Sequence, residues 1–105
     1  MSNIKIEVFW TANAKEDLKE IYISLKKKIS KETAIKIRDE LFNSPNKIVF
    51  AEQFQLDEYR LDCRRIIVRN FKILYQIKEN SIFIIRVFNS LQNPIKTLNP
   101  FIILH

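Results

Sequence analysis

Three apolar segments that follow one another closely in the second half of the chain constrain its fold more than any other feature. They span residues 64–69, 71–78 and 82–88, and Ile, Val, Phe and Tyr dominate them. These residue types suit a pleated, half-buried surface. Glu79 and Asn80 form a two-residue connection that suits a hairpin. The sequence therefore predicts three consecutive antiparallel strands, a meander.

The polar residues of these segments predict how the meander is oriented. In the segment 71–78, apolar residues occupy one face, and Lys72, Gln76 and Lys78 occupy the other, with Leu74 as the exception. The segment 82–88 is apolar on both faces except for Arg86, which predicts a central strand covered on both sides.

The turns of the meander must form without glycine, because the chain has none. Asn tolerates a positive φ angle better than most other residues do. Asn70, between the first two segments, and Asn80, between the last two, are therefore the predicted turn positions with positive φ.

The first half of the chain predicts one strand and two helices. Residues 4–10 alternate between apolar and polar types, as in a half-buried strand. Thr11 and Ser30 are candidate N-caps, and each precedes apolar residues at the three- and four-residue spacing of an amphipathic helix. Ser44 and Pro45 predict a break, followed by another turn that ends near residue 50.

Together these elements predict an α+β fold. An N-terminal strand is followed by an antiparallel helical hairpin, since the connection between the helices is short, and then by the three-stranded antiparallel meander. We expect the first strand to join the same sheet and the helices to pack on one face of it. Residues 1–105 are predicted to form a single domain, because 105 residues suffice for one core.

Composition limits the classes of function. Cys63 is the only cysteine and His105 the only histidine, so we expect no disulfide, no metal site and no cofactor. No segment approaches the ~18 apolar residues of a membrane span, and the N-terminus lacks the plan of a signal peptide. A cytoplasmic location without a membrane partner is the expectation.

The balance of charge points to acidic partners. The chain has 18 Lys and Arg residues against 12 Asp and Glu, which gives a net charge of +6 and a pI near 9.6. Such an excess favours nucleic acid or an acidic protein segment, and the alternative is a charge that serves solubility only. Many of the basic residues lie on the meander, so its face opposite the helices is predicted to be a basic surface that binds phosphates. The alternative here is an ordinary solvated sheet face.

The residues that we predict to contact a cellular target or a partner protein lie on this surface. They are Arg65, Arg69, Lys72, Arg86, Asn89 and Gln92. Arg86 is the most informative, because it interrupts an apolar strand. If it is buried, it needs a carboxylate partner such as Glu7 or Asp62; if it is exposed, it marks the open face of the sheet. The apolar segment 101–104 either adds an edge strand or meets a partner.

The meander also carries a family resemblance. The segments RRIIVRNFKILYQI (64–77) and IIRVFNSLQNP (84–94) resemble the strand core of the RelE/ParE superfamily of toxins from bacterial type II toxin–antitoxin modules, in particular its ParE-like, plasmid-stabilisation branch. The resemblance extends from Ile4 to about Leu98. It implies the RelE/ParE fold. It also implies a toxin that a cognate antitoxin with an acidic C-terminal segment neutralises in a toxin–antitoxin hetero-oligomer.

The resemblance implies more than one activity. Ribonuclease members cut messenger RNA on the ribosome without a metal, and two of their basic positions match Arg65 and Lys72, the catalytic candidates if this chain is an endoribonuclease. Ile67, Asn89 and Ser90 stand where such nucleases have basic residues, so the acid–base set is depleted.

ParE-like members of the superfamily lack this acid–base set and inhibit DNA gyrase. We therefore favour a toxin that binds its target over an enzyme. A degenerate toxin that retains only antitoxin binding is the third alternative.

Overall fold

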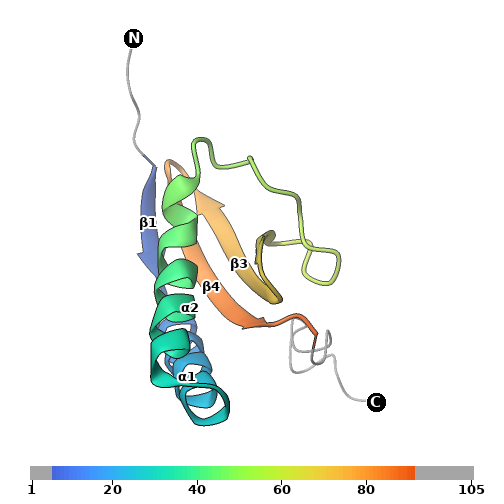
Figure 1. The fold of residues 1–105 in the computed structure, drawn as a ribbon. Helices are drawn as coiled ribbons and strands as arrows, with labels where there is room; N and C mark the ends of the chain where they lie inside the picture. The colour runs from blue at the N-terminus through green and yellow to red at the C-terminus, as the bar shows by residue number, and fades with distance from the viewer. Residues whose placement is uncertain (1–5, 92–105) are drawn as a thin grey trace.

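The computed structural model describes residues 6–91 and arranges them as a four-stranded sheet with a helical hairpin on one face (Figure 1). The elements are β1 (Glu7–Trp10), α1 (Ala12–Lys28), α2 (Lys31–Asn43), the 3-10 helix η1 (Ser44–Lys47), β2 (Arg64–Val68), β3 (Phe71–Lys78) and β4 (Ser81–Asn89). The predicted α+β fold is confirmed. The predictions made for residues 4 and 5, for Gln92 and for the segment 101–104 lie outside the described residues.

The strands are ordered β1-β4-β3-β2. β3 pairs antiparallel with both β2 and β4, so the predicted meander is confirmed. β1 joins the same sheet and runs parallel to β4, from Glu7 opposite Ser81 to Trp10 opposite Ile84. The long excursion through both helices, β2 and β3 lets the chain return in the same direction. β4 is therefore a central strand, as its apolar character predicted.

Both helices begin where the sequence predicts. Thr11 Oγ1 accepts a hydrogen bond from the amide of Ala14 at 3.3 Å, and Ser30 Oγ accepts one from the amide of Thr33 at 3.1 Å. Each side chain satisfies an amide of the first turn that has no partner within its helix.

The break after α2 is confirmed, but its details differ from the prediction. The 3-10 turn that contains Pro45 ends at Lys47 rather than near residue 50. Ser44 lies inside this turn, and its hydroxyl donates to Glu40 O at 2.8 Å, so it continues the end of α2 instead of capping a new helix.

The core lies between the helical hairpin and one face of the sheet. Leu18 of α1 and Leu41 of α2 share one apolar cluster with Ile73 and Tyr75 of β3. Tyr75 is fully buried, and its hydroxyl donates to Ala51 O at 2.8 Å. This bond ties the connection that follows η1 to the core, because a buried hydroxyl needs a partner.

A β-bulge interrupts the pairing of β3 with β4. Leu74 is opposite Arg86, but the next residue, Tyr75, is opposite Ile84, so Ile85 has no partner in β3. Such an extra residue bends the strand and shifts the alternation of side chains by one position.

α1 covers the edge of β4 beyond the end of β1. The amide and the hydroxyl of Thr11 both donate to Ile84 O, at 3.1 and 2.7 Å. Further along the strand, Asp17 Oδ2 accepts the amide of Val87 at 2.9 Å and Nε of Arg86 at 2.7 Å. This carboxylate satisfies a strand amide beyond the reach of β1. Asp17 of α1 and the N-cap Thr11 therefore fix the hairpin to the central strand.

The positive φ angles of the two hairpins are not where the sequence predicted them. Arg69 has a φ of 58° and Glu79 a φ of 57°, whereas Asn70 and Asn80 have negative φ. In both hairpins the strand register leaves a two-residue loop, and its first residue takes the positive φ. The prediction was wrong because the twist of the flanking strands sets the loop geometry, and the residue preference is too weak to override it.

The turn between β3 and β4 gives the first testable prediction. Glu79→Gly should keep the free energy of unfolding or raise it by up to about 1 kcal/mol, because glycine adopts a positive φ without a Cβ clash. Asn80→Gly is the matched control. It should lower the free energy of unfolding by about 0.5–1 kcal/mol, because at a negative φ glycine relieves no clash and only increases the conformational entropy of the unfolded chain. Urea denaturation measures both, and a Glu79→Gly variant less stable than Asn80→Gly would contradict this assignment.

Candidate functional site

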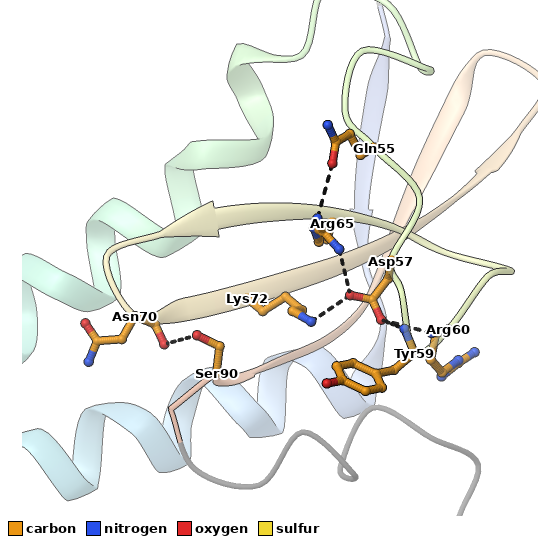
Figure 2. A network of polar contacts seen from close by, with 8 residues as sticks. All are labelled: Gln55, Asp57, Tyr59, Arg60, Arg65, Asn70, Lys72 and Ser90. Carbon is orange, nitrogen blue, oxygen red and sulfur yellow. Dashed lines mark hydrogen bonds and ion pairs between the residues drawn. The ribbon is translucent and has the colours of Figure 1, made fainter.

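The connection between η1 and β2 folds back over the face of the sheet opposite the helices, and a buried carboxylate fixes it there (Figure 2). Asp57 is 0% exposed. Its Oδ2 accepts the amides of Tyr59 and Arg60 at 3.0 and 2.9 Å, and its own amide donates to Cys63 O at 2.8 Å. These bonds close residues 57–63 into a compact turn.

Lys72 of β3 supplies the counter-charge. Its side chain is 7% exposed, and its Nζ donates to Asp57 Oδ1 at 2.7 Å. The ammonium group also lies 5.2 Å from the ring centroid of Tyr59 and 5.8 Å from that of Phe88. The predicted place of Lys72 on an open basic face is therefore wrong. Alternation puts it on the face away from the helices, but the connection covers that face, and the carboxylate and rings replace the hydration of the cation.

Arg65 of β2 is the second cation beside Asp57. Its Nη1 lies 3.9 Å from Asp57 Oδ1, and its Nη2 donates to Gln55 Oε1 at 3.2 Å. The amide of Arg65 also donates to Gln55 O at 3.0 Å, which holds the connection along the outer edge of β2. The side chain of Arg65 is 24% exposed, so this cation keeps partial access to solvent.

A groove of about 320 Å³ runs beside this network. It is lined by Glu58, Tyr59, Arg65, Ile67, Lys72, Phe88 and Ser90. The lining combines a carboxylate, a phenol, a hydroxyl and a partly exposed guanidinium. These groups can hold an anionic or hydrogen-bonding ligand, and the carboxylate and phenol can exchange protons with it.

Arg86 pairs with a carboxylate that the sequence does not suggest. Its guanidinium donates to both oxygens of Asp17, at 2.7 and 2.9 Å, and these bonds raise its pKa above the usual value. Among the described residues, the expected partners Glu7 and Asp62 form no ion pair with it. The bulge in β4 explains the difference, because it turns Arg86 toward α1. With 44% of its side chain exposed, Arg86 serves the junction of helix and sheet rather than an open basic face.

The other predicted site residues do not line the groove. Arg69, in the turn after β2, forms an ion pair with Glu40 of α2. Asn89 closes the end of β4, where its Oδ1 accepts the amide of Leu91 at 2.9 Å. Gln92 lies outside the described residues. The expected continuous basic face is therefore wrong, because two of its arginines pair with the helices. The functional roles of all six residues stay predictions.

The sequence did not single out Asp57, Glu58 and Tyr59, since it indicates only a polar connection for residues 51–61. The connection leading into the meander is rich in acidic residues, but the sequence predicts an open polar face for the segment of Lys72, so it gives no reason to expect that this cation needs a buried carboxylate. Which acidic residue reaches the strand depends on how the connection folds.

Cys63 is a structural residue rather than a nucleophile. It is 1% exposed and packs with Leu74 and Phe88. Burial raises the pKa of its thiol to about 11, so the reactive thiolate is scarce at neutral pH.

Within residues 6–91, no cluster of His, Cys, Asp and Glu side chains is arranged to hold a metal ion. No helix in this part of the chain is both long and apolar enough to cross a membrane.

Comparisons with known proteins point to one family. The model of the family described as the ParE toxin of the type II toxin–antitoxin system parDE matches residues 8–94. No curated protein matches the chain significantly. Among solved structures, a chain of the chromosomal ParDE toxin–antitoxin system from P. aeruginosa is similar, with a TM-score of 0.71 and 21% identity over 82% of this chain and 97% of that chain. The toxin RelE from E. coli, as a double arginine-to-alanine mutant in the free state, has a TM-score of 0.48 and 19% identity over 93% of this chain and 97% of that chain.

The buried ion pair of this site gives the second testable prediction. Asp57→Ala should lower the free energy of unfolding by about 3–5 kcal/mol, because it leaves the ammonium group of Lys72 buried without its counter-charge. Chemical denaturation measures the change. The double variant Asp57→Asn with Lys72→Met is the control and should be more stable than Asp57→Asn alone, because it removes both charges. A cost of Asp57→Ala below about 1 kcal/mol would show that the connection does not depend on this carboxylate.

Proposed function

This chain belongs to the ParE toxin family of type II toxin–antitoxin systems, and we propose that it acts as a toxin that binds a cellular protein and is neutralised by a cognate antitoxin. The match of the family model to residues 8–94 is the observation that carries this proposal. The net charge of +6 supports it, because a positively charged chain attracts an acidic antitoxin segment.

The state of the cations in the groove supports target binding over catalysis. Metal-free cleavage of RNA needs groups that are free to activate the ribose hydroxyl and to stabilise the phosphate. The ammonium group of Lys72 already donates to a buried carboxylate at 2.7 Å, and Ile67 offers an apolar side chain to the groove. The resemblance to ParE-like toxins makes DNA gyrase the target that we propose.

The same groove favours a ribosome-dependent endoribonuclease as the second candidate. Glu58, Tyr59 and Arg65 line it together, so a base, a proton donor and a phosphate-binding cation share one surface. These are the roles that such a nuclease needs. In this alternative Arg65 would be catalytic, and the carboxylate and phenol would replace the basic residues that are missing at Ile67 and Asn89.

Induced expression in bacteria separates the two candidates. We expect DNA-damage signalling and filamentation with intact messenger RNA, because a protein that blocks gyrase leaves DNA breaks and does not cut RNA. Mapping of RNA ends in induced cells checks this. Cuts at defined codon positions that fall at least tenfold in Arg65→Ala, but persist in the control Lys78→Ala, would replace the proposal with the nuclease. Lys78 suits the control because it is exposed on β3 and does not line the groove.

The partner gives a further testable prediction. We expect a small protein with an acidic C-terminal segment to be encoded beside the gene of this chain, and its co-expression to restore growth. Because opposite charges contribute to the contact, the affinity should fall as ionic strength rises, which titration calorimetry at several salt concentrations measures. A chain that is harmless on expression and still binds this neighbour would instead be a degenerate toxin.

A further inference from the structure

A cluster of lysines lies at the turn between α1 and α2, at the free end of the helical hairpin. Lys26, Lys27 and Lys28 form the last turn of α1, and Lys31 is the first residue of α2. All four residues are exposed. Figure 1 shows this end of the hairpin projecting past the sheet. We call these four residues the lysine tip.

The lysine tip holds much of the positive charge that the fold leaves unpaired. Within residues 6–91, none of its members forms an ion pair with a carboxylate, whereas Arg65, Lys72 and Arg86 of the sheet each contact one. Glu32 is the only acidic residue between positions 21 and 38. The four lysines and this glutamate together carry a charge of +3, which is half of the net charge of the chain.

Helix electrostatics explain only part of this cluster. The three lysines in the last turn of α1 complement the partial negative charge at that end of the helix. Lys31 has the opposite position, because the first turn of a helix favours anions over cations. Like charges that are gathered without carboxylates also repel one another. A surface that keeps such a cluster exposed suits an anionic ligand.

The arrangement of the lysine tip suits a row of anions better than a single anion. An α-helix has 3.6 residues per turn, so three successive side chains spread over more than half of its circumference. Lys31 adds a fourth cation across the turn, on the next helix. Each lysine is a point charge on a flexible stem, which contacts a phosphate without a fixed geometry. Such a spread of cations can follow a chain of phosphates.

We propose that the lysine tip binds the phosphate backbone of duplex DNA. Duplex DNA presents rows of regularly spaced phosphates, and contacts to them carry no sequence information directly. The contact is therefore independent of the base sequence. The inference rests on the proposed function for its place in the cell, because gyrase, the proposed target, holds duplex DNA, and a toxin bound to gyrase lies beside that DNA.

Other anionic partners fit the lysine tip less well. Residues 23–33 contain no aromatic residue, and single-stranded nucleic acid stacks its bases on aromatic side chains. A helix that lies on a membrane needs an apolar face with Trp, Phe or Leu, but the turn at residues 29–30 presents a single apolar side chain, Ile29. Protein interfaces favour aromatic residues and arginine at their centres and are depleted in lysine. The backbone of a duplex requires only the charges.

Anisotropy of a fluorescently labelled DNA duplex of about two helical turns tests the inference on the full chain. Lys27→Gln, Lys28→Gln and Lys31→Gln together should weaken binding at least tenfold at about 50 mM salt, because they remove three phosphate contacts. Glutamine is nearly as good a helix former as lysine, so the hairpin should persist. The melting temperature shows whether the variant is folded. Absence of binding by the wild type at this salt concentration would overturn the inference.

A matched control separates the lysine tip from the overall charge of the chain. Lys36→Gln, Lys47→Gln and Lys78→Gln remove the same number of positive charges from exposed positions outside the tip. We expect this variant to lose less than threefold in affinity. Equal losses in the two folded triple variants would show that only net charge matters and would overturn the inference.

The salt dependence counts the phosphate contacts independently. Four lysines on four phosphates predict that the logarithm of the binding constant falls with the logarithm of the salt concentration with a slope of about −3.6. The slope of the tip variant should be about −1, since one lysine remains. An unchanged slope in the tip variant would contradict the assignment. Tighter binding of an RNA duplex, or of phosphatidylglycerol vesicles, with the same dependence on the tip would overturn it by assigning the tip to RNA or to a membrane surface.

The result for the proposed function is distinguishable from the result for the lysine tip. A DNA supercoiling assay with purified gyrase measures the first, and the anisotropy of DNA alone measures the second. Inhibition of gyrase by a chain whose tip variant binds DNA as well as the wild type does would keep the proposed function and overturn the inference. Binding of DNA that depends on the tip, in a chain that leaves gyrase active, would support the inference and remove gyrase as the target.

Discussion

The buried carboxylate of Asp57 is the interaction on which the second face of the sheet depends. The connection from η1 to β2 has no helix and little strand pairing, and segments of this length without secondary structure are uncommon in compact domains. Asp57 holds it by accepting two amides of its own turn and the ammonium group of Lys72. A buried charge is costly unless it is paired, so the carboxylate and the ammonium each require the other. Once the connection is fixed, Leu74, Phe88 and Cys63 form a second apolar cluster beneath it.

This arrangement changes what the basic strands can do. Cations that a sheet would otherwise present to solvent are divided among three carboxylates in different places. Lys72 and Arg65 gather at Asp57, while Arg69 and Arg86 pair with acidic residues of the helices. A surface made of paired cations attracts phosphates less strongly than an open basic face does. This division of the cations is our reason for proposing that the chain recognises a protein, and the groove at Arg65 is the reason for keeping cleavage of a nucleic acid as the second candidate.

The helical hairpin is fixed to the central strand by polar contacts as well as by the core. Asp17 accepts the amide of Val87 beyond the end of β1, and Thr11 donates to a carbonyl oxygen of the same strand. Trp10, the last residue of β1, lies opposite Ile84 in the sheet, and its ring stacks on Phe42 of α2.

The sequence by itself determined the elements of this protein. Local patterns sufficed for the α+β class, the two helix caps at Thr11 and Ser30, and the meander, because apolar period and capping chemistry act over a few residues. Tertiary structure decided the site. Whether Lys72 is exposed depends on a connection whose path no local pattern encodes, and the partner of Arg86 depends on a bulge that shifts the strand by one residue. Buried charges find partners through contacts between distant segments, and the order of residues along the chain does not state those contacts.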